Sequence, residues 1–148
     1  MDPTLDGQQS LAYTSVSEQT LQPTWVLEHV QRASTGAAVL FVGLVRNHDG
    51  GRGVNWLEYS SHPSADDVLR EVTAEILDDH PHVQALSAHH RIGRLDIGDV
   101  ALVAVVSSSH RAASFRACED LVERVKARIP IWKRQVFTDG DEEWVNSP

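Results

Sequence analysis

Residues 99–134 read DVALVAVVSSSHRAASFRACEDLVERVKARIPIWKR. The segment opens with a short, valine-rich apolar run to Ser107, which is typical of a buried strand. The serines that follow supply an N-cap for a helix. Pro130 ends that helix, because proline has no N–H to donate and its ring clashes with the preceding turn. Ile131 then begins a second strand, so the segment predicts a strand, a helix and a strand in succession.

The helix in this segment has one apolar face. Its nonpolar residues recur every three or four positions, which predicts a side that packs on the core. Cys118 falls on that side, and we interpret it as a core residue and not a nucleophile, because free cysteine packs as a small hydrophobe. The face consists of Phe115, Cys118, Leu121, Val122, Val125 and Ile129.

The rest of the chain adds strands and two further helices. Apolar spacing predicts the clearest helix over 63–79, and Pro23 suits the first turn of a short helix over 24–33. We therefore predict an α+β fold with a mixed, mainly antiparallel sheet and about three helices. It forms one compact domain over 11–148, preceded by a flexible arm at 1–10. The expected strands are 11–16, 37–45 (buried), 54–60, 83–92, 99–107, 131–138 and 143–145, with an exposed loop over 46–53.

Composition limits the function classes. The chain has 148 residues and a formal net charge of -8, which argues against nucleic-acid binding through overall charge. Its apolar runs are too short for a membrane span, and its first residues lack the pattern of a signal peptide. A single cysteine allows no internal disulfide, so we expect a cytoplasmic protein. The pairs His80 with His82 and His89 with His90 lack a cysteine partner or an HExxH pattern, so we expect no metal and no cofactor.

Basic residues concentrate between positions 110 and 134, and the rest of the chain carries the acidic excess. Of the 13 cations in the chain, only Lys126 and Lys133 are lysines. Lysine can lose its proton when it is desolvated or lies beside another cation, whereas arginine stays charged. The pair is therefore a candidate for proton transfer or nucleophilic chemistry. The alternative is a solvated helix end where Lys126 and Arg128 complement the helix dipole.

Three more basic residues stand at the ends of predicted elements. His110 and Arg111 begin the helix, where free backbone N–H groups attract anions. Arg46 follows a predicted strand, and loops at strand ends often form binding sites. We predict that these three residues and the two lysines form one basic pocket for a phosphorylated small molecule.

Short motifs follow one another in a fixed order along the chain. They are Gly43–His48, Leu57–Tyr59, His90–Gly93, Gly98–Asp99, Ser109–Arg111, Lys126–Arg134 and Trp144–Val145. Together they resemble the large, catalytic subunit of molybdopterin synthase. The resemblance covers roughly residues 11 to 146, and ordered motifs over such a length are more specific than any one of them. It implies an α/β hammerhead fold, with 11–148 as the catalytic domain.

The resemblance also implies partners and a reaction. The large subunit forms a homodimer, and a small, ubiquitin-like sulfur carrier binds at each end to give a heterotetramer. The carrier's C-terminal Gly-Gly ends as a thiocarboxylate. Two sulfurs pass to cyclic pyranopterin monophosphate (precursor Z), which becomes molybdopterin with its dithiolene. The chain is therefore expected to be a sulfurtransferase of molybdenum cofactor biosynthesis.

Single residues receive roles from the same resemblance. Lys126 is similar to the main catalytic lysine, and Lys133 to a second essential one. We expect neighbouring cations and partial burial to lower the pKa of Lys126, so that it assists attack by the thiocarboxylate. Gln135 stands where the family has a glutamate, and Leu44 stands where some members have a lysine. The implied substrate-binding residues are Leu44, Val45, Arg46, His110, Arg111, Arg134 and Gln135.

Two other functions stay open at this point. One is a non-catalytic, ferredoxin-like module that binds a phosphorylated effector. The other is a structural subunit whose basic helix end docks an acidic partner. The first would bind a phosphate ligand but yield no sulfurated product with any carrier. The second would tolerate Lys126→Ala without loss of activity in the complex.

Overall fold

Within residues 11–145, which the computed structural model describes, the chain forms nine strands and three helices. Residues 1–10, where the arm is expected, and residues 146–148 lie outside the described part. The elements are β1 Leu11–Ser17, α1 Pro23–His29, β2 Ala37–Leu44, β3 His48–Asp49, β4 Arg52–Ser61, α2 Ala65–Asp79, β5 Val83–Arg91, β6 Gly93–Asp96, β7 Val100–Ser108, α3 Arg111–Arg128, β8 Ile131–Phe137 and β9 Glu142–Val145.

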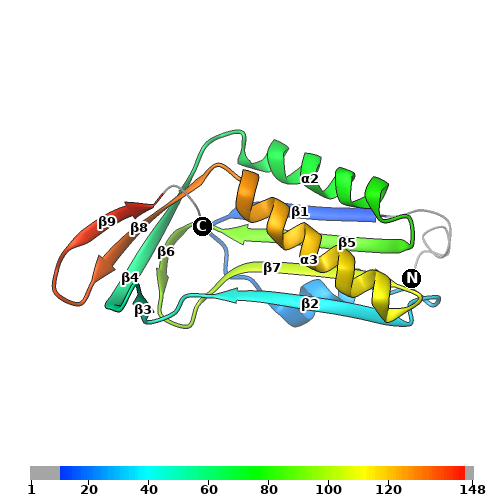
Figure 1. Cartoon of the computed structure of the whole chain (residues 1–148), viewed down its shortest axis with the longest axis horizontal. Helices are drawn as coiled ribbons and strands as arrows, with labels where there is room; N and C mark the ends of the chain where they lie inside the picture. The colour runs from blue at the N-terminus through cyan, green and yellow to red at the C-terminus, as the bar shows by residue number, and fades with distance from the viewer. Residues whose placement is uncertain (1–10, 146–148) are drawn as a thin grey trace.

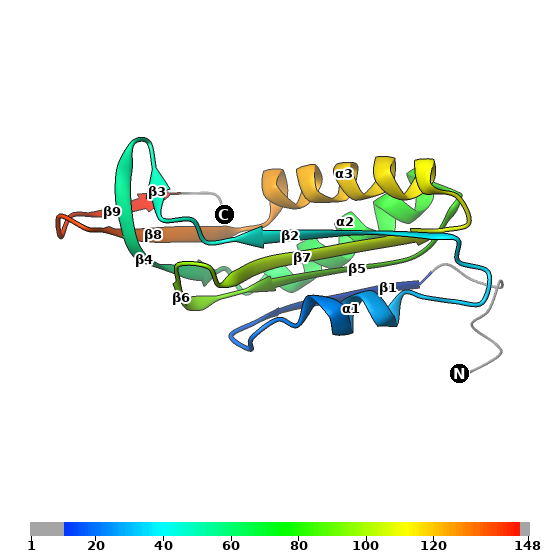
Figure 2. The same ribbon diagram turned by 90° about the horizontal axis from the view of Figure 1, so that it is seen from below.

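The larger sheet has four strands in the order β1-β5-β7-β2. Strands β5, β7 and β2 pair antiparallel, and β1 joins β5 in parallel. Helices α2 and α3 cover one face of this sheet and α1 covers the other (Figures 1 and 2). Strand β2 is an edge strand, so one of its sides has no neighbouring strand in the described chain.

A second, antiparallel sheet extends from one end of the first (Figure 1). Its order is β3-β4-β8-β9, and β6 also pairs with β4. Helix α3 leads directly into β8, because Pro130 stops the helix and the chain turns there. The end of α3 therefore lies where the two sheets meet. The predicted α+β class, with three helices and mainly antiparallel pairing, is confirmed.

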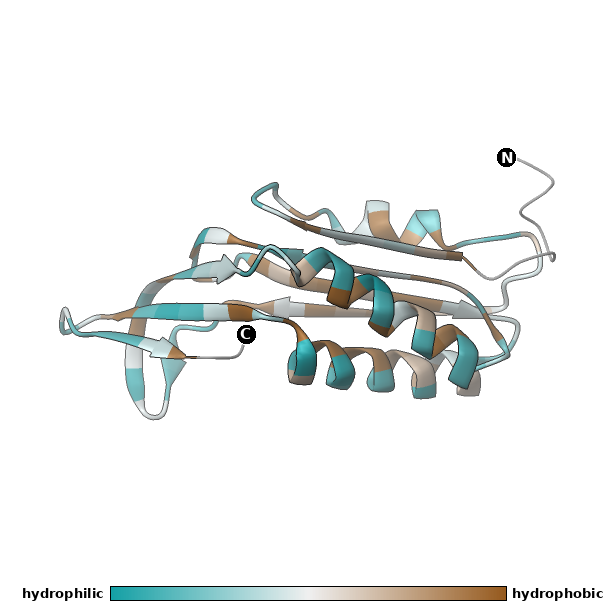
Figure 3. Ribbon diagram, turned by 90° about the horizontal axis from the view of Figure 1, so that it is seen from above, coloured by the Kyte–Doolittle hydropathy of each residue, from teal (hydrophilic) through white to brown (hydrophobic). Residues whose placement is uncertain are grey.

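The main core lies between the larger sheet and the helices α2 and α3. Brown and teal residues alternate along both helices in Figure 3, as expected for helices with one apolar face. Each large apolar side chain buried here contributes roughly 1.5–3 kcal/mol relative to an exposed one. None of the described helices is long and apolar enough to cross a membrane. The fully buried side chains of this core include Leu69, Val72, Ile76, Leu86, Val106, Leu121 and Val125.

Two predicted elements differ from the structure. Helix α1 ends at His29, before the predicted limit at residue 33. The Ser107 hydroxyl donates to the carbonyl of Val30 at 2.7 Å, so this carbonyl bonds to β7 instead of to a further helical turn. The strand predicted over 37–45 is present as β2, but its predicted burial is wrong. It is half buried because it lies at the edge of the sheet.

Two short strands, β3 and β6, were not predicted from the sequence. Strand β3 lies inside the segment predicted as a loop, and Gly50 and Gly51 close a two-residue hairpin from it to β4. Their φ angles of 57° and 80° are left-handed, which suits glycine. Strand β6 is only four residues long and exists by pairing with β4, a contact distant in sequence.

Candidate active site

Three parts of the chain converge on a cavity of about 300 Å³ at the junction of the two sheets. Lys126 lies in the last turn of α3, Lys133 and Gln135 lie on β8, and Arg46 follows β2. Because side chains alternate along a strand, Lys133 and Gln135 point to the same face of β8. The lining residues are Leu44, Val45, Arg46, His48, Asp49, Val54, Leu57, Tyr59, Lys126, Lys133 and Gln135.

The two lysines lie in different surroundings. Lys126 is exposed, so the predicted partial burial of this residue is wrong, whereas Lys133 is half buried. Burial lowers the pKa of Lys133, and the positive charges of Lys126 and Arg46 lower it further, against the opposing charges of Asp49 and Glu143. The amine that loses its proton more readily than usual is therefore Lys133.

A carboxylate faces these cations. The Gln135 side-chain amide donates to Asp49 Oδ2 at 2.8 Å, and Arg46 lies 3.4 Å from Asp49 Oδ1. The Gln135 bond lowers the pKa of Asp49, and the charges of Lys133 and Arg46 lower it further despite desolvation. Asp49 is therefore ionised at neutral pH. The motif resemblance covers the segment up to His48 and misses this neighbouring residue.

Tyr59 lines the cavity and is in contact with the buried His90. Burial raises the pKa of Tyr59 to about 12, so its hydroxyl stays neutral. The ring of His90 meets the Tyr59 ring edge-on, with centroids 5.0 Å apart. Burial lowers the pKa of His90 to about 4. Both rings are neutral near pH 7, and the charges of the site therefore come from Arg46, Asp49 and the two lysines.

Arg134 does not line the cavity. It lies between Lys133 and Gln135 on β8 and so points to the opposite face of the strand. Its guanidinium is 2.7 Å from Glu142 and 3.5 Å from Glu58. The expectation that it contacts the substrate in the same cavity is not supported by this position. The other sequence-predicted residues that do meet there are Leu44, Val45, Arg46, Lys126, Lys133 and Gln135.

His110 and Arg111 lie at the opposite end of α3 from Lys126 (Figure 1). Lys126 comes fifteen positions after Arg111 on the helix, which places them about 22 Å apart along the helix axis. His110 lines a different, small cavity near the start of the helix. Within a single chain the five basic residues therefore do not share one pocket, and a common pocket stays a prediction for a boundary between two subunits.

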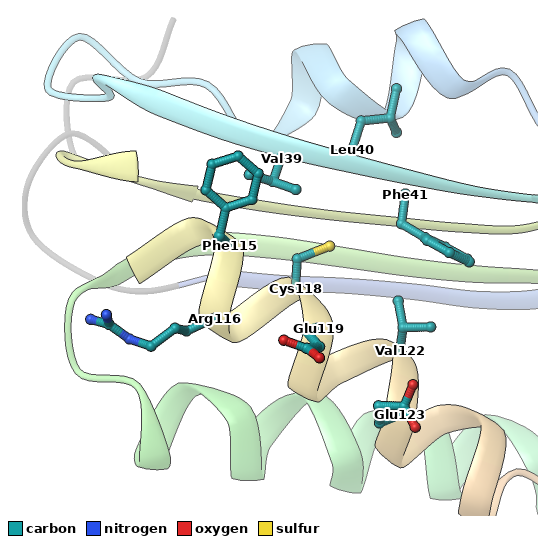
Figure 4. Close-up of a pocket in the computed structure, with 9 residues that line it drawn as sticks. All are labelled: Val39, Leu40, Phe41, Phe115, Arg116, Cys118, Glu119, Val122 and Glu123. Atoms are coloured by element: carbon teal, nitrogen blue, oxygen red, sulfur yellow. The ribbon is translucent and has the colours of Figure 1, made fainter. Parts of the chain in front are cut away.

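An apolar groove of about 420 Å³ runs between β2 and α3. Figure 4 shows Phe115 and Cys118 of α3 and Val39 and Phe41 of β2 along it. Cys118 is buried, as predicted, and burial raises the pKa of its thiol to about 11. Phe115 was predicted on the buried face but is 61% exposed, because the edge strand leaves this side of the helix uncovered.

A model of the MoaE protein family matches residues 16–128. The chain belongs to the MoaE protein family. Among its relatives is the molybdopterin synthase catalytic subunit of Neosartorya fischeri, 38% identical over 129 residues. That match covers 84% of this chain, and the chain spans 66% of the length of the fungal protein.

Solved MoaE-type structures share the fold. Molybdopterin synthase from Staphylococcus aureus superposes with a TM-score of 0.82 at 34% identity, over 88% of this chain and 94% of that chain. A more distant match is a complex of subunits 1 and 2 of molybdopterin-converting factor from Helicobacter pylori. It has a TM-score of 0.68 and 20% identity, over 90% of this chain and 89% of that chain. At that identity the second match indicates the fold alone.

Proposed function

We propose that this chain is the catalytic subunit of a molybdopterin synthase, a sulfurtransferase of molybdenum cofactor biosynthesis. The observation that carries the proposal is the cavity that gathers both lysines of the chain with Arg46. Membership of the MoaE family and the identity to a curated catalytic subunit support it. We expect the protein in the cytoplasm, in keeping with its one free, buried cysteine.

The substrate of this proposal is cyclic pyranopterin monophosphate. Arg46, Lys126 and Lys133 provide positive charge for a phosphate, and Leu57 and Tyr59 provide an apolar wall for a ring. The implied contacts at Leu44, Val45 and Gln135 line the same cavity. Sites for small molecules usually combine apolar side chains with a few charged or polar groups that orient the ligand.

The two lysines have separate roles in the proposed chemistry. Lys126, exposed at the end of α3, is suited to hold the incoming thiocarboxylate and to stabilise the oxyanion that develops on its carbonyl oxygen when water cleaves the C–S bond and releases the carrier as a carboxylate. Lys133, whose pKa is lowered chiefly by burial, is suited to proton transfer. Lys126 remains the main catalytic lysine in this proposal, and Lys133 the second.

A homodimer would bring His110 and Arg111 to the site. Strand β2 begins beside the start of α3, where the Gly36 N–H donates to the Ser108 carbonyl at 3.1 Å, and it ends at the cavity. If two copies pair their β2 edges antiparallel about a two-fold axis, the start of one strand lies against the end of the other. His110 and Arg111 of one copy then approach Arg46 of the other. The exposed Phe115 and the apolar groove beside β2 support this as the contact surface.

The sulfur donor is proposed to be a small carrier subunit with a C-terminal Gly-Gly thiocarboxylate. The Helicobacter pylori structure, a complex of two subunits of molybdopterin-converting factor, supports a two-subunit assembly for proteins of this fold. One carrier on each copy of the dimer gives the proposed heterotetramer. The basic cavity suits the carrier's anionic terminus as well as a phosphate.

Reconstitution tests the proposal. The purified chain, a thiocarboxylated carrier and precursor Z should yield molybdopterin. Lys126→Ala should reduce the rate at least about 100-fold, and Lys133→Arg should also fail, because the proposed role of Lys133 requires proton transfer and arginine keeps its proton. Arg70→Ala removes an exposed charge from α2 and serves as the matched control. Phosphate binding without sulfurated product would favour the non-catalytic module, and full activity of Lys126→Ala would contradict the assigned role.

A further inference from the structure

Asp49 is the only acid among the described residues that line the cavity. It lies in the two-residue strand β3, next to the Gly50-Gly51 turn that folds this strand back onto β4. A negative charge in a pocket for anions weakens anion binding, because like charges repel. Its position therefore calls for a role in the site.

Gln135 holds this carboxylate in place. Gln135 is 2% exposed, and its amide donates to Asp49 Oδ2 at 2.8 Å. The amide N–H donates to a carboxylate oxygen, and a hydrogen bond donated to the charged form favours the ionised carboxylate over the protonated acid. The second oxygen faces the Arg46 guanidinium at 3.4 Å. The carboxylate thus links β3, β8 and the segment after β2 around the half-buried Lys133.

We propose that Asp49, held by Gln135, is a positioning residue that keeps one negative charge beside Arg46 and Lys133 and so sets the charge balance of the lysine pocket. This inference rests on the proposed function for its role in catalysis. The bond to Gln135 and the contact with Arg46 fix the place of that charge.

The charges around Lys133 come from four parts of the chain. Asp49 of β3 and Glu143 of β9 favour the protonated amine, whereas Lys126 of α3 and Arg46 oppose it together with burial. Removal of the Asp49 charge leaves Glu143 to counter two cations and the desolvation. The pKa of Lys133 should then fall further below its ordinary value.

The lysine composition allows a direct measurement. The chain has two lysines, so selective ¹³Cε labelling gives two side-chain signals, which Lys126→Arg and Lys133→Arg assign. Asp49→Asn keeps the shape and leaves a carbonyl oxygen for the Gln135 amide, so it removes only the charge. We expect the Lys133 titration to move to lower pH. In Asp49→Asn/Gln135→Glu the bond is reversed and the carboxylate moves to β8, and the titration should return toward the wild-type position.

Asp96→Asn is the matched control, because Asp96 lies 3.4 Å from Arg94, the same separation as Asp49 from Arg46, but outside the cavity. It should leave both lysine signals unchanged. An unshifted Lys133 titration in Asp49→Asn, or no return in the double variant, overturns the inference. If Asp49→Asn does not fold, the double variant is compared with Gln135→Glu, which places two carboxylates at this position and should move the titration upward.

The sulfur-transfer assay separates this inference from the proposed function. The limb of the pH-rate profile that reports Lys133 should shift to lower pH in Asp49→Asn and return in the double variant. If the wild-type chain makes no molybdopterin, the proposed function fails while the lysine titrations still decide the role of Asp49. If molybdopterin forms but the titration does not move, only the inference about Asp49 fails.

Discussion

At the scale of single residues, the candidate site combines charged side chains with the neutral rings of Tyr59 and His90. His90 and Tyr59 are buried and uncharged at neutral pH. The His90 Nδ1–H donates to the Arg91 carbonyl at 2.8 Å, which fixes the orientation of the ring. A charged imidazole here would repel Lys126, whose positive charge helps to lower the pKa of His90.

The buried His90 makes stability depend on pH. Its pKa is about 4 in the folded chain, against an ordinary value of 6.5. Below pH 6.5 the unfolded chain binds a proton on His90, whereas His90 in the folded chain stays neutral until the pH nears 4. The contribution of His90 to the free energy of unfolding is therefore complete above pH 6.5 and is lost as the pH falls toward 4. A shift of this size corresponds to roughly 3 kcal/mol. Urea unfolding across this range should show a shallower decline for His90→Gln than for wild type. The exposed His62→Gln should follow wild type, and a wild-type slope in His90→Gln would contradict the assignment.

At the scale of elements, α3 connects the core to the site. Its apolar face packs under the larger sheet through Leu121 and Val125, and the next residue, Lys126, reaches the cavity. Its start carries His110 and Arg111 at the far end of the molecule. The helix therefore fixes the distance between the two groups of basic residues.

Loss of packing under α3 should destabilise the chain. Leu121 is fully buried, so Leu121→Ala leaves a cavity and should lower the free energy of unfolding by about 2–5 kcal/mol. Urea denaturation at fixed protein concentration measures the change. Glu123→Ala, an exposed substitution on the same helix, should stay within about 0.5 kcal/mol of wild type. Equal stabilities for the two variants would mean that this face does not support the core.

At the scale of the whole molecule, one chain carries two separate groups of basic residues. The lysine cavity lies at one end of α3 and the His110–Arg111 pair at the other. An edge strand with an apolar groove runs between them. Pairing of two copies along this edge would complete both sites at once.

Mixed dimers test whether the sites are shared. Chains with Lys126→Ala and chains with Arg111→Ala should each be nearly inactive alone. After random exchange half of the dimers are mixed, and one of their two sites carries neither substitution. Activity should then recover to about a quarter of the wild-type value. No recovery is expected if each site forms within one chain, and the addition of Phe115→Asp to both chains, which places a charge in the groove, should abolish the recovery together with the dimer.

Features that depend on neighbours along the chain could be predicted from the sequence alone. Apolar spacing located α2 and α3, Pro130 marked the end of α3, and the valine-rich run located β7, because helix and strand periods are local properties. The resemblance also indicated the family and six of the residues that line the cavity, which are Leu44, Val45, Arg46, Lys126, Lys133 and Gln135.

Which of these residues meet depends on the three-dimensional fold. The length of α3 separates Arg111 from Lys126. Side chains alternate along β8, so Arg134 points away from the cavity. Phe115 stays exposed because β2 lies at the edge of the sheet. The fold also brings Asp49 to Gln135, a contact across 86 positions of sequence. Burial and charge at a site are sums over neighbours in space, and no local period of the sequence records them.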